Sequence, residues 1–399
     1  MALDFSFTEE QRMLEDQVYR WATTWLEPQM EHLYEVDEMP PTLFKEFGNL
    51  GINGIVFEEK YGGAALGYVE TLLVYETIAR VSNALSMTCG ASQTLCFDNF
   101  RRNATEEQKM RVLPKACSGE WIGCLGITEP NAGSDAMSMA TKAEKKGDRY
   151  IINGSKIFIT NGPVADFMVF YAKTDPAAGP KGISTFFFET AEPKKKGTVK
   201  FEKIKKWGMR TSPTALVTFQ DMEIPEDQLI GGLNKGVAVL TSGLCTERIT
   251  LSGCTLGGQR TCLELSLKYA KERVQFGKPI ASFQSIQEKL ANMYCGYKAG
   301  KWLAYSAAAY CDSLENKSGG KGTDLDRMAA AALLFTGEMG TKIGLDAIQI
   351  FGGYGYTTEY PISRHFLDQK LWEIGAGTSE IRRMIIAREL LRDDFKSGL

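Results

Sequence analysis

Histidine is nearly absent from this chain, which contains only His32 and His365 in 399 residues. Because histidine is the commonest metal ligand and the general base of Ser-His-Asp triads, this scarcity argues against both kinds of site. The nine cysteines are scattered and form no CxxC pair. They predict reduced core residues in a reducing compartment, and neither a disulfide framework nor a zinc site.

Strong net charge and long apolar runs are also missing. A net charge of −3 argues against nucleic acid or an anionic membrane as the main partner. No apolar run reaches the roughly 18 residues that a membrane-spanning helix needs. The first residues, MALDFSFTEEQRML, lack the basic segment of a signal peptide. We therefore expect a cytoplasmic protein of the bacterial type, or a mitochondrial matrix protein if a presequence has been removed.

The order of sequence patterns predicts an α+β fold. A capping box at Thr8 and Gln11 opens a helical region that continues to about Gly119. Short β-rich runs separated by Gly, Pro and Asp follow, and long helical patterns return after Gly236. We predict an N-terminal α domain at 1–119, a middle β domain at 120–232 and a C-terminal α domain at 233–399. The clearest predicted strands are 149–160, 167–172, 183–189 and 216–219.

One carboxylate lies where the helix pattern calls for an apolar residue. Apolar or small residues recur, mostly at steps of three and four, from Leu240 to Tyr269, and Glu247 is the one acidic residue among them. No cation lies three or four residues away on the same helix. A buried, unpaired carboxylate is costly, so Glu247 is a functional acid or base, or it meets a cation from another helix, or the stripe reaches solvent there.

Five short motifs carry chemistry when they are taken together. Singly, each also fits ordinary local structure, such as a loop, a helix C-cap or an N-capped helix start. They are Ile127–Asp135 (ITEPNAGSD), Phe158–Gly162 (FITNG), Arg273–Gly277 (RVQFG), Gln349–Gly353 (QIFGG) with the following YGY, and Gly375–Arg383 (GAGTSEIRR). In this order and spacing they resemble the acyl-CoA dehydrogenase family, and the resemblance covers nearly the whole chain.

The resemblance implies a barrel-like middle domain, a C-terminal four-helix bundle, and FAD bound between the β domain and the C-terminal helices. It also implies at least a dimer, and usually a homotetramer (a dimer of dimers), because part of each FAD is contacted by a second subunit. The flavin and ribityl positions match Leu125, Ile127, Thr128, Gly133, Ser134, Phe158, Ile159 and Thr160. The second-subunit positions match Arg273, Phe276, Gln284, Gln349, Gly352 and Gly353, and the remaining cofactor contacts match Thr378 and Glu380.

The resemblance also implies which residue is the catalytic base. Most family members carry the base as the glutamate of a YEGTSE-like motif, and Ala376 stands at that position here. A minority, including the isovaleryl-CoA and long-chain dehydrogenases, place it on the earlier helix at the position of Glu247, and GAGTSEIRR resembles the isovaleryl-CoA branch. An apolar site suits this role, because an exposed glutamate is too weak a base for carbon.

The family resemblance also implies which positions contact the substrate. The backbone N–H of Ala376 and the flavin's ribityl hydroxyl would stabilise the incipient enolate. The other matching positions are Ser134, Arg248 and Gly377, although a structural ion pair is an alternative role for Arg248. No metal is implied.

The implied reaction is FAD-dependent α,β-dehydrogenation of a short, branched, α-substituted or cyclic acyl-CoA, with an electron-transfer flavoprotein or similar acceptor as partner. The segment NALSMTCGASQ (83–93) has no basic residue where glutaryl-CoA dehydrogenases carry an arginine, although Arg101 and Arg102 lie just beyond it. Two alternatives remain. One is an acyl-CoA oxidase or flavin monooxygenase that reduces oxygen. The other is a non-catalytic scaffold protein, against which the retention of Glu247 and of every flavin segment argues.

Overall fold

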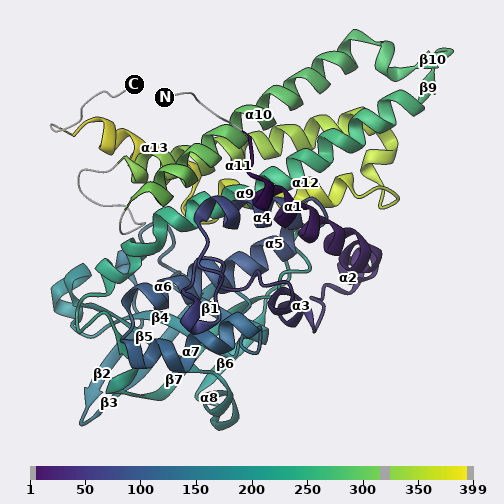
Figure 1. Ribbon diagram of the computed structural model, residues 1–399. Coiled ribbons are helices and arrows are strands. Elements are labelled where there is room, and N and C mark those ends of the chain that lie inside the picture. The colour runs from purple at the N-terminus through teal and green to yellow at the C-terminus, as the bar shows by residue number, and fades with distance from the viewer. Residues whose placement is uncertain (1–5, 315–323, 393–399) are drawn as a thin grey trace. The chain divides into compact units, whose positions relative to one another are not determined.

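The computed structural model describes residues 6–314 and 324–392, which form two compact units. The first unit comprises Met1–Glu35, Gly67–Ser86 and Arg248–Leu399, and the second comprises Val36–Leu66 and Met87–Glu247. Figure 1 labels their helices and strands. The helical, β and helical regions appear in the predicted order, so the α+β class is confirmed. The predicted domain limits at 119 and 232 stay a prediction.

The first unit is built from helices. Its long helices α10 and α11 run side by side (Figure 1). Helix α9 approaches α4 so closely that a Cβ on Gly257 would lie 2.1 Å from the Glu76 carbonyl oxygen, which only glycine permits. The helices are α1 (Glu9–Trp21), α4 (Tyr68–Ala79), α10 (Gln284–Ser313), α11 (Leu325–Phe351), α12 (Ile362–Gln369) and α13 (Ser379–Leu390), while α2 (Met30–Val36), α5 (Asn83–Gly90) and α9 (Gly236–Glu272) cross the division between the units.

Local signals at helix ends behave as predicted. Thr8 and Gln11 form the capping box of α1, with the Gln11 N–H donating to Thr8 Oγ1 at 3.2 Å and the Thr8 N–H donating to Gln11 Oε1 at 3.1 Å. Thr378 is the N-cap of α13 and accepts from the Ile381 N–H at 3.4 Å. These contacts depend on residues three positions apart, which explains why the sequence reveals them.

The second unit contains an eight-stranded sheet with the order β6-β7-β3-β2-β4-β5-β8, and β1 pairs with β4. Within the described residues the edge strands β6 and β8 do not pair with each other, so the sheet is open and the predicted barrel-like domain is not a closed barrel. The strands are β1 (Gly123–Gly126), β2 (Lys142–Lys146), β3 (Arg149–Thr160), β4 (Phe167–Lys173), β5 (Ile183–Glu189), β6 (Val199–Lys203), β7 (Thr214–Pro225) and β8 (Leu229–Ile230); the helices are α3 (Leu43–Asn49), α6 (Asp98–Asn103), α7 (Glu106–Ser118) and α8 (Ala191–Lys196).

Strand β4 is buried on both faces of the sheet, which explains its continuous run of apolar residues. Alternate side chains point to opposite faces. Phe167, Val169 and Tyr171 join a core with α6 and α7, whereas Met168, Phe170 and Ala172 join a second core with β3 and β7. Aromatic pairs such as Phe97 and Phe167, with ring centroids 5.4 Å apart, fill the first core.

Helix α9 contains the predicted stripe from Leu240 to Tyr269, so the helix is confirmed. Its burial differs from the one-sided pattern we expected, because every residue from Cys245 to Gln259 is buried. Glu247 is 7% exposed. The alternative in which the stripe reaches solvent at Glu247 is therefore wrong.

A buried ionic cluster joins α4 to α10 within the first unit. Glu76, 1% exposed, accepts hydrogen bonds from Tyr297 Oη at 2.7 Å, Lys301 Nζ at 3.1 Å and Tyr305 Oη at 2.8 Å. Burial raises the pKa of Glu76, but Lys301 and the two hydroxyls outweigh it and hold that pKa below its ordinary value. The carboxylate therefore stays charged inside the helical unit.

Acidification should destabilise the protein through His365 on α12. His365 is 2% exposed, and burial, helped by Arg364, lowers its pKa to about 3. In the unfolded chain the pKa of His365 is about 6.5. Below that pH the unfolded chain therefore binds a proton on His365, whereas the folded chain does not. We therefore expect the free energy of unfolding to fall by about 2 kcal/mol between pH 6.5 and pH 5, since each pH unit changes it by ~1.4 kcal/mol. Urea unfolding midpoints at the two pH values measure this loss of stability.

The second histidine provides the control for this prediction. His365→Gln should remove most of the change in urea midpoint between the two pH values, whereas the same substitution at the exposed His32 should leave it in place. Equal pH dependence in the wild type and the His365 variant would contradict the assignment.

All nine cysteines are free thiols, and eight of them are buried. No helix in the described part of the chain is both long and apolar enough to cross a membrane.

Candidate active site

The predicted site residues fall into two groups, one in each unit. In the second unit, the loop after β1 lies against the end of β3. The Ile157 N–H donates to the Thr128 carbonyl oxygen at 2.9 Å, and Lys156 Nζ donates to the Ile127 carbonyl oxygen at 3.1 Å. The structure therefore brings Ile127 and Thr128 beside the segment Phe158–Thr160. Gly133 and Ser134 lie further along the loop and are exposed.

A buried ion pair holds this loop in place. Lys156 Nζ, with its side chain fully buried, lies 2.7 Å from Glu129 Oε1. Glu129 also accepts from the Ala140 and Thr141 N–H groups. Burial lowers the pKa of Lys156 to about 8, because the attraction of Glu129 offsets only part of the lost hydration. This pair could not be predicted from the sequence, since nothing local links the ITEP motif to a lysine 27 residues away.

Phe158 is presented by a bulge. The register between β3 and β7 shifts between Lys156 and Ile159, and Phe158 has a φ of 60°. A left-handed aromatic residue is uncommon, and a bulge of this kind re-aims a side chain. Phe158 is 64% exposed, although its neighbour Ile159 is buried in the core. An exposed aromatic face at this position fits the edge or face of a planar ring.

Glu247 lines a small cavity in the same unit. The cavity holds about 10 Å³, enough for roughly one water molecule. Two of the residues predicted at the flavin, Leu125 and Ile127, line it too, so the structure brings them to the same cavity as Glu247. The remaining lining residues are Thr94, Leu95, Asn99, Leu240, Gly243 and Leu244.

Asn99 and Tyr171 organise the wall of this cavity. Tyr171 Oη donates to Asn99 Oδ1 at 3.1 Å, and Asn99 Nδ2 donates to the Val239 carbonyl oxygen at 3.0 Å. Burial raises the pKa of Tyr171, and the nearby charge of Glu247 adds to the rise. These residues could not be predicted from the sequence, because they lie on elements far from Glu247 in the chain.

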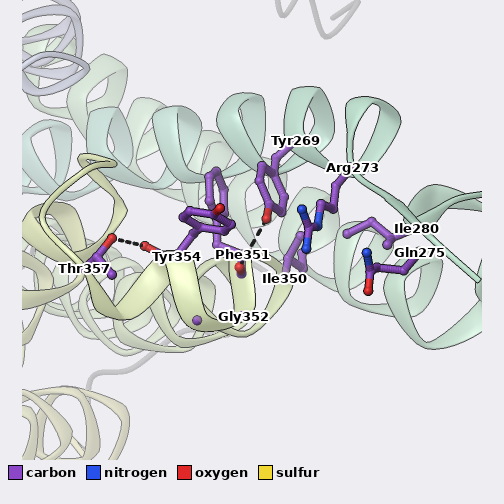
Figure 2. Close-up of a pocket in the computed structure, with 10 residues that line it drawn as sticks. Tyr269, Arg273, Gln275, Ile280, Ile350, Phe351, Gly352, Tyr354 and Thr357 are labelled. Atoms are coloured by element: carbon purple, nitrogen blue, oxygen red, sulfur yellow. Dashed lines mark hydrogen bonds between the residues drawn. The ribbon is translucent and has the colours of Figure 1, made fainter.

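In the first unit, the predicted cofactor residues Arg273, Gly352 and Gly353 line one hollow of about 460 Å³ (Figure 2). Tyr269 and Phe351 stack in its wall with ring centroids 4.2 Å apart. The other lining residues are Gln275, Ile280, Ile350, Tyr354 and Thr357.

This hollow fits the pyrophosphate and adenosine of FAD in size and chemistry. Ligand pockets commonly have about 300–1,000 Å³ and aromatic walls. A guanidinium suits a pyrophosphate, and flat rings suit an adenine. A Cβ added to Gly352 or Gly353 would meet no atom within 4 Å, so the two glycines leave this space open. The other predicted positions, Phe276, Gln284 and Gln349, lie outside the hollow's lining. Phe276 is 92% exposed at the tip of the hairpin formed by β9 (Val274–Gln275) and β10 (Lys278–Pro279).

The turn before α13 carries the last predicted positions. Ala376 has a φ of 55° and Gly377 a φ of 86°, so both lie in the left-handed region. Thr378 follows as the N-cap of α13, and Glu380 is exposed.

Arg248, on α9, is 6% exposed and its Nε has no hydrogen-bond partner in the described residues. An unsatisfied buried donor of this kind fits a ligand oxygen better than a structural ion pair.

Three family descriptions match successive parts of this chain. "Acyl-CoA dehydrogenase, N-terminal domain" matches residues 8–120, the "middle domain" matches 124–222, and the "C-terminal domain" matches 234–391. The chain belongs to the acyl-CoA dehydrogenase family. As a family member it is an oxidoreductase, and the family resemblance inferred from the five motifs is confirmed.

Individual relatives agree with this assignment. The mitochondrial isovaleryl-CoA dehydrogenase of Pongo abelii is 43% identical over 390 residues, which cover 97% of this chain and 90% of the relative. The solved butyryl-CoA dehydrogenase from Megasphaera elsdenii is 35% identical with a TM-score of 0.92, covering 98% of this chain and 100% of that one. A structure described as "PigA with FAD and proline" is 31% identical with a TM-score of 0.91, covering 97% and 99%. FAD is the cofactor of this acyl-CoA dehydrogenase.

Proposed function

We propose that this protein dehydrogenates a short, branched acyl-CoA between its α- and β-carbons, with Glu247 as the catalytic base. One observation carries the proposal: a buried glutamate lines a cavity with Leu125 and Ile127, while the usual base position holds Ala376, which cannot take a proton. The GAGTSEIRR motif and 43% identity to an isovaleryl-CoA dehydrogenase support the branched substrate.

Glu247 acts on the α-proton of the substrate. Glu247 is 7% exposed and shares its cavity with the apolar residues Leu240, Leu244 and Ile127. A carboxylate out of water is a stronger base, which the removal of a proton from carbon requires. Asn99 and Tyr171 keep the cavity wall in place around it. FAD, when bound, supplies the acceptor for the β-hydride.

The enolate that forms as the α-proton leaves needs hydrogen-bond donors at the thioester oxygen. The Ala376 N–H is a backbone donor, so it survives the loss of the usual glutamate side chain. Ser134, Arg248 and Gly377 complete the proposed substrate contacts. The unsatisfied Nε of Arg248 supports its part in this set.

Each FAD would be held by two subunits. In one subunit, Leu125, Ile127, Thr128, Gly133 and Ser134 together with Phe158–Thr160 would face the flavin and its ribityl chain. Arg273, Gly352 and Gly353 of a second copy would hold the pyrophosphate and adenosine, with its Phe276, Gln284 and Gln349 nearby. Thr378 and Glu380 would supply the remaining cofactor contacts. The exposed Phe158 and the open hollow support this division.

An apolar acyl chain agrees with the arrangement of the two arginines that follow the segment 83–93. Arg101 Nη2 lies 2.7 Å from Asp98 Oδ1, and Arg102 Nε lies 3.0 Å from Asp98 Oδ2. Because both arginines form ion pairs with the fully buried Asp98, their charges already have a structural partner. This supports a monocarboxylic acyl chain over a glutaryl-like one.

A second subunit is part of the proposal. Phe276 and Tyr356 are 92% and 90% exposed, so a second subunit that covers them would remove two large aromatic side chains from water. Contact with a second copy and its FAD would cover Phe276. We propose a homotetramer, and an electron-transfer flavoprotein or similar protein as the electron acceptor.

Bleaching of the flavin by a panel of acyl-CoAs tests the proposed function. We expect anaerobic isovaleryl-CoA and other short branched acyl-CoAs to reduce the bound FAD faster than glutaryl-CoA or long straight-chain acyl-CoAs. Rapid peroxide production in air, without an added acceptor, would indicate an oxidase. A purified protein that binds no FAD would contradict the proposal altogether.

A further inference from the structure

Arg382 on α13 is fully buried and binds backbone carbonyls. Its Nη1 donates to the Trp372 carbonyl oxygen at 2.6 Å and to the Leu333 carbonyl oxygen at 3.4 Å. Its Nη2 donates to the Gly375 carbonyl oxygen. The guanidinium therefore connects α13 to α11 and to the turn that carries Ala376, all within the first unit.

The Gly375 carbonyl and the Ala376 N–H belong to the same peptide group. This group is planar and trans, so its oxygen and its N–H point in opposite directions. When Arg382 fixes the oxygen on the protein side, it also fixes the direction of the N–H on the opposite side. The Ala376 N–H donates to no acceptor in the described part of the chain, so it is available to a ligand.

A cation on the carbonyl oxygen also changes the strength of the N–H. Hydrogen bonds to a charged donor are strong, and they polarise the group that accepts them. Electron density drawn toward the guanidinium leaves the amide hydrogen more positive. The Ala376 N–H is then a better donor to a developing negative charge than an ordinary backbone amide.

We propose that Arg382 is a positioning residue that orients and strengthens the Ala376 N–H as the donor to the thioester oxygen of acyl-CoA. This inference rests on the proposed function, which supplies the place of the thioester. It gives a role to the first arginine of the GAGTSEIRR motif, which the family resemblance leaves without one.

The adjacent arginines allow a matched comparison of Arg382→Gln with Arg383→Gln. Arg383 has a side chain that is 52% exposed and pairs with Glu338 at 2.6 Å. In the FAD-loaded Arg382→Gln protein we expect flavin reduction to slow by about 10- to 100-fold, somewhat less than removal of an oxyanion-hole donor costs. Acyl-CoA affinity should change little, because the N–H contributes mainly to the enolate.

A spectroscopic measurement separates this role from a general structural one. Acetoacetyl-CoA ionises to an enolate, and the pH at which the enzyme-bound form does so reports on the donors at its thioester oxygen. We expect this pH to rise by about one unit or more in Arg382→Gln, about a tenfold change in the ionisation constant. Arg383→Gln should match the wild type in both measurements. An Arg382→Gln enzyme with a wild-type reduction rate and enolate pH would overturn the proposal.

Arg382→Lys decides the question if the glutamine variant does not fold. A lysine keeps the cation but not the two-pronged geometry, so we expect a reduction rate between those of wild type and Arg382→Gln. A wild-type rate in the lysine variant, or loss of the fold in both variants, would overturn the proposal. If no acyl-CoA reduces the flavin of the wild type, the proposed function fails. If the wild type is active and the Arg382 variants match it, only the role of Arg382 fails.

Discussion

Glu247→Gln should slow flavin reduction by an acyl-CoA by about 10³-fold or more, since general-base catalysis typically contributes about 10²–10⁴ and no carboxylate stands at the usual position. Glutamine has the same shape, so the cavity with Leu125 and Ile127 keeps its packing. The amide cannot accept the α-proton. FAD content and the acyl-CoA dissociation constant should therefore stay near wild type. Anaerobic stopped-flow absorbance of the flavin measures the rate directly.

Glu264→Gln is the matched control, because Glu264 is an exposed glutamate on the same helix. Its reduction rate should equal that of the wild type. A Glu247→Gln enzyme with a near-wild-type rate would rule out Glu247 as the base.

Ala376→Glu in the Glu247→Gln background asks whether the family's two base positions are interchangeable. Alanine already adopts a φ of 55° there, so a glutamate adds no new backbone strain. We expect partial recovery of flavin reduction. A double variant that stays inactive with an intact flavin spectrum would show that this site accepts a base only at 247.

Lys301→Met should destabilise the helical unit by about 3–5 kcal/mol, the usual result of removing one partner of a buried ion pair. Lys301 Nζ lies 3.1 Å from Glu76 Oε1, and both side chains are buried. Methionine leaves the Glu76 carboxylate with its two tyrosine hydroxyls but without a countercharge. The urea or thermal unfolding midpoint of the purified protein measures the loss.

Lys289 on the same helix is the matched control. It pairs with Asp346 at 3.0 Å, but both side chains are about one-third exposed, so Lys289→Met should cost at most about 1 kcal/mol. The double variant Glu76→Leu/Lys301→Met should recover much of the lost stability, because it removes the buried charge along with its partner. Equal losses in the two lysine variants would show that burial does not decide the strength of these pairs.

Local patterns in the sequence predicted the elements well. Strands 149–160 and 183–189 have the observed bounds of β3 and β5, and the capping box of α1 and the N-cap at Thr378 are present. The predicted strand 216–219 was too short, because β7 continues from Thr214 to Pro225 through a polar stretch that the β pattern does not mark. The stripe on α9 predicted the burial of Glu247 but not the burial of the whole surface around it.

The sequence by itself determined the family, the order of helices and strands, and the identity of the one acidic side chain in the stripe of α9. The elements and the acidic residue follow from periodicity and turn residues, which act over a few positions, whereas the family follows from the resemblance of five motifs spread over the chain. Only the tertiary structure decided which groups meet across long stretches of chain: Lys156 with Glu129, Tyr171 with Asn99, Lys301 with Glu76, and Arg382 with the Gly375 carbonyl. A buried polar group must find a partner, but the sequence around it does not name that partner, because the choice depends on how distant elements pack.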